Sequence, residues 1–320
     1  MRDSSSKTNV SSITSEIMGD KPPRNRDFGS PTGMKILEFL MRICPLWVVY
    51  GVAMLPVIWY YLKRPEGRSS SRTYQKMLGY AYGPTKRFLF GLSQARAFSY
   101  VILDNMYLGI FGNKRFRIEE KGTEIFRTAL SKGRGLILLS AHVGNWHLAL
   151  NFLWNTNTRV HLVTDELRQN EVRRQMDRAK ESADHLTVHS NIRDPGLIFE
   201  LRAALSRGEV VILAGDRAAS DRRVRIPFLG GDAWFPTNPF ALADAVKAPV
   251  CTALTFRKGM QRYTCYGIGP FNPDGPSPIE DKNKRVEYMA RKFAGHLEEY
   301  IRQFPHQWFN FYNFWQNTPT

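Results

Sequence analysis

The chain has 320 residues, of which 43% are hydrophobic and 12% aromatic; this excludes a wholly disordered protein and fits one α/β domain with appendages. Its formal net charge of +16 is typical of proteins that meet nucleic acid, anionic lipid headgroups or an acidic carrier protein. Composition alone does not choose among these partners. Cys44, Cys251 and Cys265 form neither a C-x-x-C pair nor a metal-binding spacing, which favours a reducing compartment.

The N-terminal part divides into two regions. Residues 1–33 are polar and rich in Ser, Pro, Lys and Arg, so we expect a disordered basic tail. Residues 43–62 carry no charge and have basic flanks, with the larger group on the C-terminal side. We therefore predict a transmembrane or membrane-embedded segment within 34–64, kinked or folded into a hairpin by Pro45 and Pro56, with the following domain in the cytoplasm. A pair of buried core helices is the alternative.

Residues 65–320 are predicted to form one domain, which begins with a turn-rich break at 64–71 and two or three helices between Tyr74 and Gly112. Strands are expected at Phe116–Glu119, Leu136–Ala141, Val160–Thr164, Leu186–His189, Val210–Ala214, Val250–Phe256 and Tyr263–Ile268. Helices are expected at Thr123–Ser131, Trp146–Trp154, Asn170–Ser182, Gly196–Arg207, Pro239–Val246 and Ile279–Arg302.

This alternation predicts an α/β fold with a mixed, mostly parallel central sheet and helices on both faces. The last two strands are joined through a short Gly-containing turn, so we expect an antiparallel hairpin at one edge of the sheet. The C-terminal stretch 306–315 is too aromatic for a solvated end. It is expected to dock on the body of the domain or in the membrane interface.

The most informative stretch is Ser140–His147, SAHVGNWH, which follows the apolar run 135–139. A short apolar run closed by turn residues predicts a buried strand, so His142 is expected at the carboxyl end of a central strand, where α/β sheets bind ligands. A helix is expected to begin near Gly144 or Asn145. The backbone N–H groups of those two residues are then candidates for an oxyanion cradle.

A second strand, Val210–Ala214, is expected to end in Gly-Asp216-Arg217, and a basic loop with Arg222, Arg223 and Arg225 follows. The loop leads into VRIPFLGG at 224–231 and FPTNPFALA at 235–243. Further basic residues are spread over one predicted helix and its approach: Arg168, Arg173, Arg174 and Arg178. Together these cations are candidates for binding a phosphate of a lipid, of coenzyme A or of a phosphopantetheine carrier; a solvated basic face is the alternative.

These blocks resemble, in order and spacing, the bacterial lipid A biosynthesis acyltransferase family, within the lysophospholipid acyltransferase superfamily. The resemblance runs from about Ile43 to Trp315 and includes SAHVGNW, the strand-end Asp216, the VRIPFLGG block, the proline turn at 235–243 and KAPV at 247–250. It implies substrate-binding roles near Gly230 and Asn238, where Asn238 replaces a family glycine and tolerates the same left-handed conformation. Acceptor identity does not follow from it.

One position departs from the family pattern. The family has Asp or Glu five positions after its histidine, where this chain has His147. A carboxylate normally orients the catalytic base and stabilises its cationic form. We expect Asp216 to supply it instead, with Asp165 and Glu166 as fallbacks. His147 either supports catalysis or marks an altered, weak enzyme.

The resemblance predicts a membrane-bound acyltransferase that moves a fatty acyl group from a thioester donor, acyl carrier protein or acyl-coenzyme A, to a hydroxyl of a lipid or glycolipid. His142 is the expected general base. Gly144, Asn145 and Arg217 are the expected oxyanion donors, and no cofactor is needed. The expected location is the bacterial inner membrane, with the domain facing the cytoplasm.

The sequence leaves three rival functions. A catalytically silent lipid- or carrier-binding relative is the main alternative. A hydrolase is disfavoured because the chain has no G-x-S-x-G elbow, and nucleic acid because it has no known binding signature. No metal site is predicted: His142 and His147 are five apart, and His185 and His189, four apart, fall on a predicted strand.

Overall fold

The computed structural model describes residues 31–149, 158–164, 185–189, 194, 196–217, 222–273 and 279–315. A seven-stranded sheet lies at its centre, in the order β1-β9-β8-β2-β5-β3-β4. Its strands are β1 Arg117–Lys121, β2 Leu136–Ser140, β3 Val160–Val163, β4 Leu186–His189, β5 Val210–Ala214, β8 Val250–Gly259 and β9 Arg262–Phe271. Neighbouring strands are parallel except β8 and β9, which form an antiparallel hairpin.

The sheet confirms the predicted fold class, with one correction. The hairpin does not end the sheet, because β1 pairs in parallel outside β9 and is the edge strand. The sequence around β1 is mostly charged and its strand is largely exposed. An exposed, charged strand suits an edge, where one side of the ladder meets water.

Helices cover both faces of the sheet, as predicted. The helices described after β1 are α6 Glu124–Leu130, α7 Trp146–Ala149, α9 Leu197–Ser206, α10 Asn238–Val246, α11 Lys282–Gln303 and the 3-10 turn η3 Pro305–Gln307. All of β2 is buried, and its side chains alternate between two cores. Ile137 and Leu139 pack with α9 and α11, whereas Leu136 and Leu138 pack with α6. The helix predicted at 170–182 lies outside the described residues, as does most of the one at 146–154.

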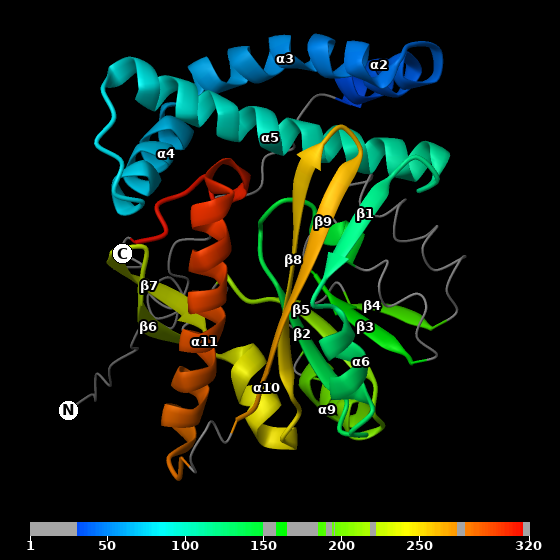
Figure 1. The fold of residues 1–320 in the computed structure, drawn as a ribbon, viewed down its shortest axis with the longest axis vertical. Coiled ribbons are helices and arrows are strands. Elements are labelled where there is room, and N and C mark those ends of the chain that lie inside the picture. The colour runs from blue at the N-terminus through cyan, green and yellow to red at the C-terminus, as the bar shows by residue number, and fades with distance from the viewer. Residues whose placement is uncertain are drawn as a thin grey trace, which may run out of the picture.

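A separate helical layer runs across one end of the sheet (Figure 1). It consists of α2 Pro31–Ile43, α3 Leu46–Lys63, α4 Pro65–Met77 and α5 Pro84–Phe111. Pro45 separates α2 from α3, while α3 continues through Pro56. The predicted break at 64–71 is confined to Arg64, because Pro65 occupies the first helical position, where its missing N–H costs nothing, and α4 continues from there.

A buried ion pair fastens this layer to the sheet. Asp104 of α5 is fully buried and accepts a bond from Arg257 Nε of β8 at 3.0 Å and from the Tyr263 hydroxyl of β9 at 2.5 Å. Tyr50 of α3 donates its hydroxyl to the same carboxylate. Removing one partner of a buried pair leaves an uncompensated charge, so this network fixes where α3 and α5 sit on the sheet.

A two-stranded hairpin, β6 Arg223–Phe228 and β7 Gly231–Pro236, replaces the predicted basic loop. Its two-residue turn has Leu229 at φ 51° and Gly230 at φ 81°, the left-handed pair of a type I′ turn. Glu298 of α11 accepts the Leu229 N–H at 2.7 Å and so holds the turn on the body. Trp315 also donates its indole N–H to the Phe228 carbonyl at 3.1 Å.

Candidate active site

His142 and Asp216 are hydrogen-bonded at the carboxyl end of the sheet. The Nδ1 atom of His142 lies 2.8 Å from Asp216 Oδ1, and the His142 backbone N–H donates to Oδ2 at 2.9 Å. The contact follows from register: Ser140 of β2 pairs with Ala214 of β5, so the second residue beyond each strand lies at the same edge. The expected juxtaposition of His142 with Asp216 is therefore present.

Asp216 has an interior environment that favours its anion. Its side chain is only 1% exposed, and the Trp308 indole N–H lies 3.4 Å from Oδ2. Burial by itself raises the pKa of Asp216, but His142 beside it, with Arg217 also near, outweighs burial and lowers the pKa to about 2. An ionised carboxylate can only accept, so Nδ1 of His142 carries the proton. Nε2 is then the basic nitrogen, on a side chain that is 15% exposed.

The amides of Gly144 and Asn145 do not form the expected oxyanion cradle. Gly144 N–H donates to the Gln307 carbonyl at 2.8 Å, and Asn145 N–H donates to the Thr255 carbonyl at 2.9 Å. The reason is that α7 begins at Trp146, and the preceding residues pair with the C-terminal tail and β8. Gly144 has φ 47°, and an added Cβ would lie 1.9 Å from the Thr255 oxygen, so this approach needs glycine.

The side chain of His147 bonds Asn105, whereas that of His142 bonds Asp216. Its Nδ1 accepts a bond from the Asn105 side-chain amide of α5 at 3.1 Å, and its ring stacks on Trp146. Asn105 in turn accepts from the Asn145 side chain at 2.6 Å. Since Nδ1 acts as an acceptor, His147 is a neutral ring in this arrangement. The structure therefore pairs His142 with Asp216 and ties His147 to the helical layer.

The other predicted binding residues are spread over the fold. Arg217 follows Asp216, and its guanidinium lies 5.9 Å from the Tyr312 ring centre. Arg225 is half-exposed on β6 and forms an ion pair with Asp232 at 3.1 Å. Gly230 is a residue of the β6–β7 turn, which gives it a structural role there. Arg168 lies outside the described residues, as do Asp165 and Glu166.

Asn238, a residue type that tolerates a left-handed conformation, does not adopt one here. It is the exposed first residue of α10, whereas the left-handed residue of this helix is Lys247, the cap at its C-terminal end. The helix N-terminus with Pro239 in its first turn still matches the expected proline turn.

Tail residues complete the site. Gln307 clamps Arg257 of β8 through two bonds, accepting from its N–H at 2.8 Å and donating to its carbonyl at 2.9 Å. Trp308 is fully buried, and Phe309 N–H donates to the His142 carbonyl at 2.8 Å. The aromatic composition of 306–315 predicted docking on the body, which is confirmed. No local sequence pattern indicated that residues 306–315 would pack against the His142–Asp216 pair.

The geometry suits base catalysis on a polar O–H or N–H group. A buried anion holds the Nδ1–H tautomer, and the strand-end position leaves the ring partly open. Cys251 and Cys265 are not partners in this chemistry, because both are buried in the sheet, where burial raises the pKa of each to about 12.

The chain matches the family model "Bacterial lipid A biosynthesis acyltransferase" over residues 95–317. Among solved structures, the 1-acyl-sn-glycerophosphate (LPA) acyltransferase PlsC from Thermotoga maritima matches with a TM-score of 0.37 and 13% identity, over 82% of this chain and 95% of that chain. Among curated proteins nothing matches. The family match covers well over half of the chain, including β1 to β9 and the His142–Asp216 pair, and the protein therefore belongs to the bacterial lipid A biosynthesis acyltransferases.

Proposed function

We propose that this acyltransferase moves a fatty acyl group from a thioester donor directly to a hydroxyl of a lipid or glycolipid, with His142 as general base. The observation that carries the proposal is the 2.8 Å bond between His142 Nδ1 and the buried Asp216 carboxylate. It orients the ring and stabilises the imidazolium that forms during the reaction.

The steps balance without a cofactor or an enzyme nucleophile. Nε2 of His142 takes the proton of the acceptor hydroxyl as its oxygen attacks the thioester carbonyl. The tetrahedral intermediate collapses with loss of the thiolate, which takes the proton from the imidazolium and leaves as the free thiol. Arg217, whose Nη2 lies 3.5 Å from the Phe309 carbonyl, is the proposed cation for the developing oxyanion.

The β6–β7 hairpin is the proposed contact for the donor. It begins at Arg223, whose guanidinium lies 4.7 Å from the Trp234 ring centre, and the exposed Arg222 directly precedes it. Acyl carrier protein and coenzyme A both present a phosphopantetheine phosphate, which arginine binds well. The net charge of +16 also favours an acidic carrier over a neutral one.

The helical layer is the proposed membrane contact. One helix, Leu46–Lys63, is long and apolar enough to cross a membrane by length and composition. One face of α3 is buried against α5 through Val49, Tyr50 and Ala53. The opposite side is exposed: Trp47 is 66%, Leu55 71%, Trp59 63% and Leu62 52% accessible. Ile36, Phe39 and Ile43 extend this apolar face along α2, at 54% to 61% accessible.

This arrangement favours a helix that lies in the interface over one that spans the bilayer. Tyr50, in the second turn of α3, donates to the Asp104 carboxylate, which is paired with Arg257 of the sheet. If α3 spanned the bilayer, the Asp104–Arg257 ion pair that Tyr50 contacts would lie in the hydrocarbon core, where an ion pair is costly. An in-plane α3 puts its aromatic and aliphatic face in the acyl chains, and Lys63 and Arg64 at the anionic headgroups. The proposed location is the cytoplasmic leaflet of the bacterial inner membrane.

The proposed chemistry is tested with the purified full chain in mixed micelles that carry hydroxyl lipids and glycolipids. Free thiol released from acyl-coenzyme A or acyl carrier protein is followed, and the acylated lipid is identified by mass spectrometry. We expect acceptor-dependent thiol release by wild type and none by His142→Ala. Equal release by both proteins would contradict the base and favour the silent, lipid-binding alternative.

A further inference from the structure

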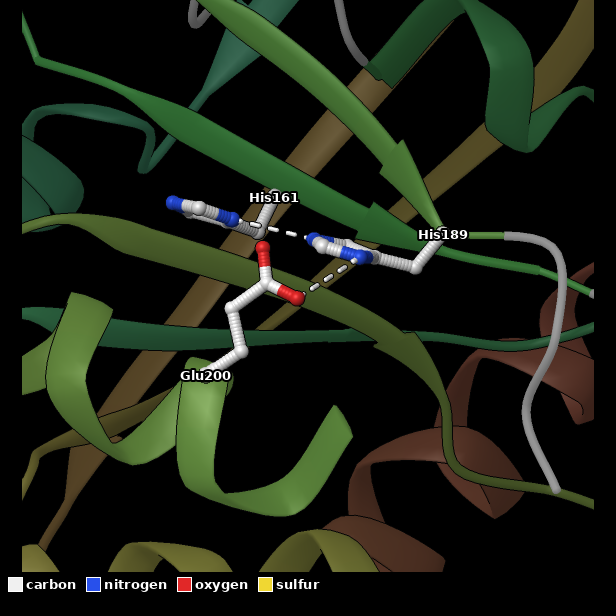
Figure 2. A group of neighbouring side chains, drawn as sticks. All are labelled: His161, His189 and Glu200. Carbon is white, nitrogen blue, oxygen red and sulfur yellow. Dashed lines mark hydrogen bonds and ion pairs between the residues drawn. The ribbon is translucent and has the colours of Figure 1, made fainter. Parts of the chain in front are cut away.

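Two histidines and a glutamate meet on the α9 side of the sheet, away from the His142–Asp216 pair. His161 is the second residue of β3, His189 is the last residue of β4, and Glu200 lies in the first turn of α9. Because β3 and β4 are parallel, with His161 opposite Thr187 and Val163 opposite His189, both rings leave the same face. Figure 2 shows the Glu200 carboxylate reaching from α9 toward the two rings.

The ligand atoms of this cluster lie close together. Nδ1 of His161 and Nε2 of His189 are 3.0 Å apart, and Glu200 Oε2 lies 3.7 Å from His189 Nδ1. One ligand atom from each of the three residues lies within 4.8 Å of the other two. Two nitrogens bound to one tetrahedral Zn²⁺ at normal lengths are about 3.3 Å apart, so a small separation of the rings makes room for the ion.

A buried carboxylate prepares His161 to be a ligand. Glu209 Oε2 lies 2.7 Å from His161 Nε2, and Arg207 donates to both oxygens of Glu209, at 2.7 and 2.9 Å. The guanidinium holds Glu209 as an anion, which can only accept, so His161 carries its proton on Nε2. Nδ1 then keeps its lone pair toward His189. Histidines that bind metals typically donate their other N–H to a carboxylate in this way.

We propose that His161, His189 and Glu200 bind a divalent transition-metal ion, best suited to Zn²⁺, with Glu209 and Arg207 as its second layer. Two imidazoles and one carboxylate form a ligand set that Zn²⁺ uses in proteins, and imidazole disfavours Mg²⁺ and Ca²⁺. His161 is 4% exposed, whereas the Glu200 side chain is 53% exposed, so the fourth position is open to water on the Glu200 side.

The bound ion would have a structural effect. It would tie β4, an edge strand of the sheet, to β3 and to α9. Any ligand that binds only the folded chain stabilises that state by mass action. Zinc is therefore expected to raise the thermal unfolding temperature of the chelator-treated protein, independently of acyl transfer.

The probe is the metal alone, added to the chelator-treated full chain. We expect about one tightly bound Zn²⁺ per chain after dialysis, measured by elemental mass spectrometry, and a Co²⁺ visible spectrum with nitrogen and oxygen ligands. His189→Ala should lose the ion. Glu200→Gln, at a half-exposed side chain, should weaken binding at least tenfold, and Glu209→Gln by 10- to 100-fold.

Two matched controls distinguish this site from other histidines. His185→Ala, four residues before His189, and His142→Ala at the active site should both keep the ion. Absence of stoichiometric Zn²⁺ in wild type would overturn the proposal. Undiminished binding by Glu200→Gln and His189→Ala, or loss of binding in His142→Ala alone, would overturn it as well, because the ion would then lie elsewhere.

Discussion

Replacing Asp216 by asparagine keeps the shape of the side chain and removes its charge. In the wild type, Oδ1 faces His142 Nδ1 at 2.8 Å and Oδ2 faces the His142 backbone N–H at 2.9 Å. An asparagine has one oxygen and one NH₂ group for these two places. If its oxygen accepts the backbone N–H, its NH₂ donates to Nδ1 and moves the ring proton to Nε2. If the asparagine amide is rotated by 180°, its oxygen accepts from Nδ1–H, but its NH₂ group faces the His142 backbone N–H, so two donors meet in a buried site.

Either orientation impairs the base. In the first, Nε2 is protonated and has no lone pair for the acceptor hydroxyl; in the second, the imidazolium loses its counter-charge. By comparison with triad acids, we expect kcat/KM to fall about 10³- to 10⁴-fold, equivalent to about 4 to 5.5 kcal/mol of transition-state stabilisation.

The assay is the initial rate of thiol release from the acyl donor at fixed acceptor, for wild type, Asp216→Asn and His142→Ala. KM for the donor should change little in the two variants, because neither residue is placed at the donor contact. Asp216→Asn activity within threefold of wild type, in a folded protein, would refute the assignment of Asp216 as the orienting carboxylate.

The same carboxylate predicts an acid-sensitive part of stability. Its pKa falls from 3.8 to about 2 on folding, because His142 and Arg217 outweigh burial. A lowered pKa contributes stability that is fully present above about pH 4 and is lost as the pH falls toward 2, here on the order of 2 kcal/mol. The difference in unfolding free energy between wild type and Asp216→Asn, from urea titrations, should therefore shrink as the pH falls from 5 to 3. A constant difference would contradict the lowered pKa.

Three other predictions follow from the geometry. His147→Ala should lose one side-chain hydrogen bond and keep thiol release within about tenfold of wild type, and His147→Glu should be tolerated, since a carboxylate also accepts from the Asn105 amide. Gly144→Ala, with its Cβ 1.9 Å from a carbonyl oxygen, should cost about 3 kcal/mol in urea unfolding. The double variant Leu55→Glu, Trp59→Glu should reduce co-sedimentation with anionic vesicles at least tenfold.

The first of these has a contradicting outcome, and the other two have control variants on the same chain. For His147, a dead alanine variant beside a near-normal Asp216→Asn would show that the second imidazole is the partner of His142. Gly295→Ala, in α11 with no atom within 4 Å of the added Cβ, should be neutral or stabilising. Phe199→Glu changes a residue that is 68% exposed on α9, at the far end from α3 in Figure 1, and should leave vesicle binding unchanged.

The sequence predicted the site where local rules apply. His142 follows a fully buried strand and Asp216 an apolar one that is mostly buried, and parallel strands bring such strand ends to one edge of the sheet. The same strand-end rule led to the wrong prediction that the Gly144 and Asn145 amides are oxyanion donors. Gly144 pairs with Gln307, and a contact between residues so far apart in sequence leaves no trace in the local pattern.

Long-range contacts explain the other differences. Asn105 is one polar residue in a helix, and only the packing of α5 on the site gives it His147 as a partner. The β6–β7 hairpin was missed because Leu229 takes a left-handed conformation that leucine rarely adopts, so the turn lacked the usual Asn-Gly signal. His161, His189 and Glu200 come from three elements, and spacing along the chain does not bring them together.

Lipid mass spectrometry of bacterial cells tests the central claim, acyl transfer through His142, most directly. Cells that lack the gene are compared with cells that express wild type or His142→Ala at matched levels in the membrane fraction. We predict one or more lipids heavier by a fatty acyl group in cells with the wild type, absent both without the gene and with His142→Ala. The same lipid profile with wild type and His142→Ala would contradict the claim.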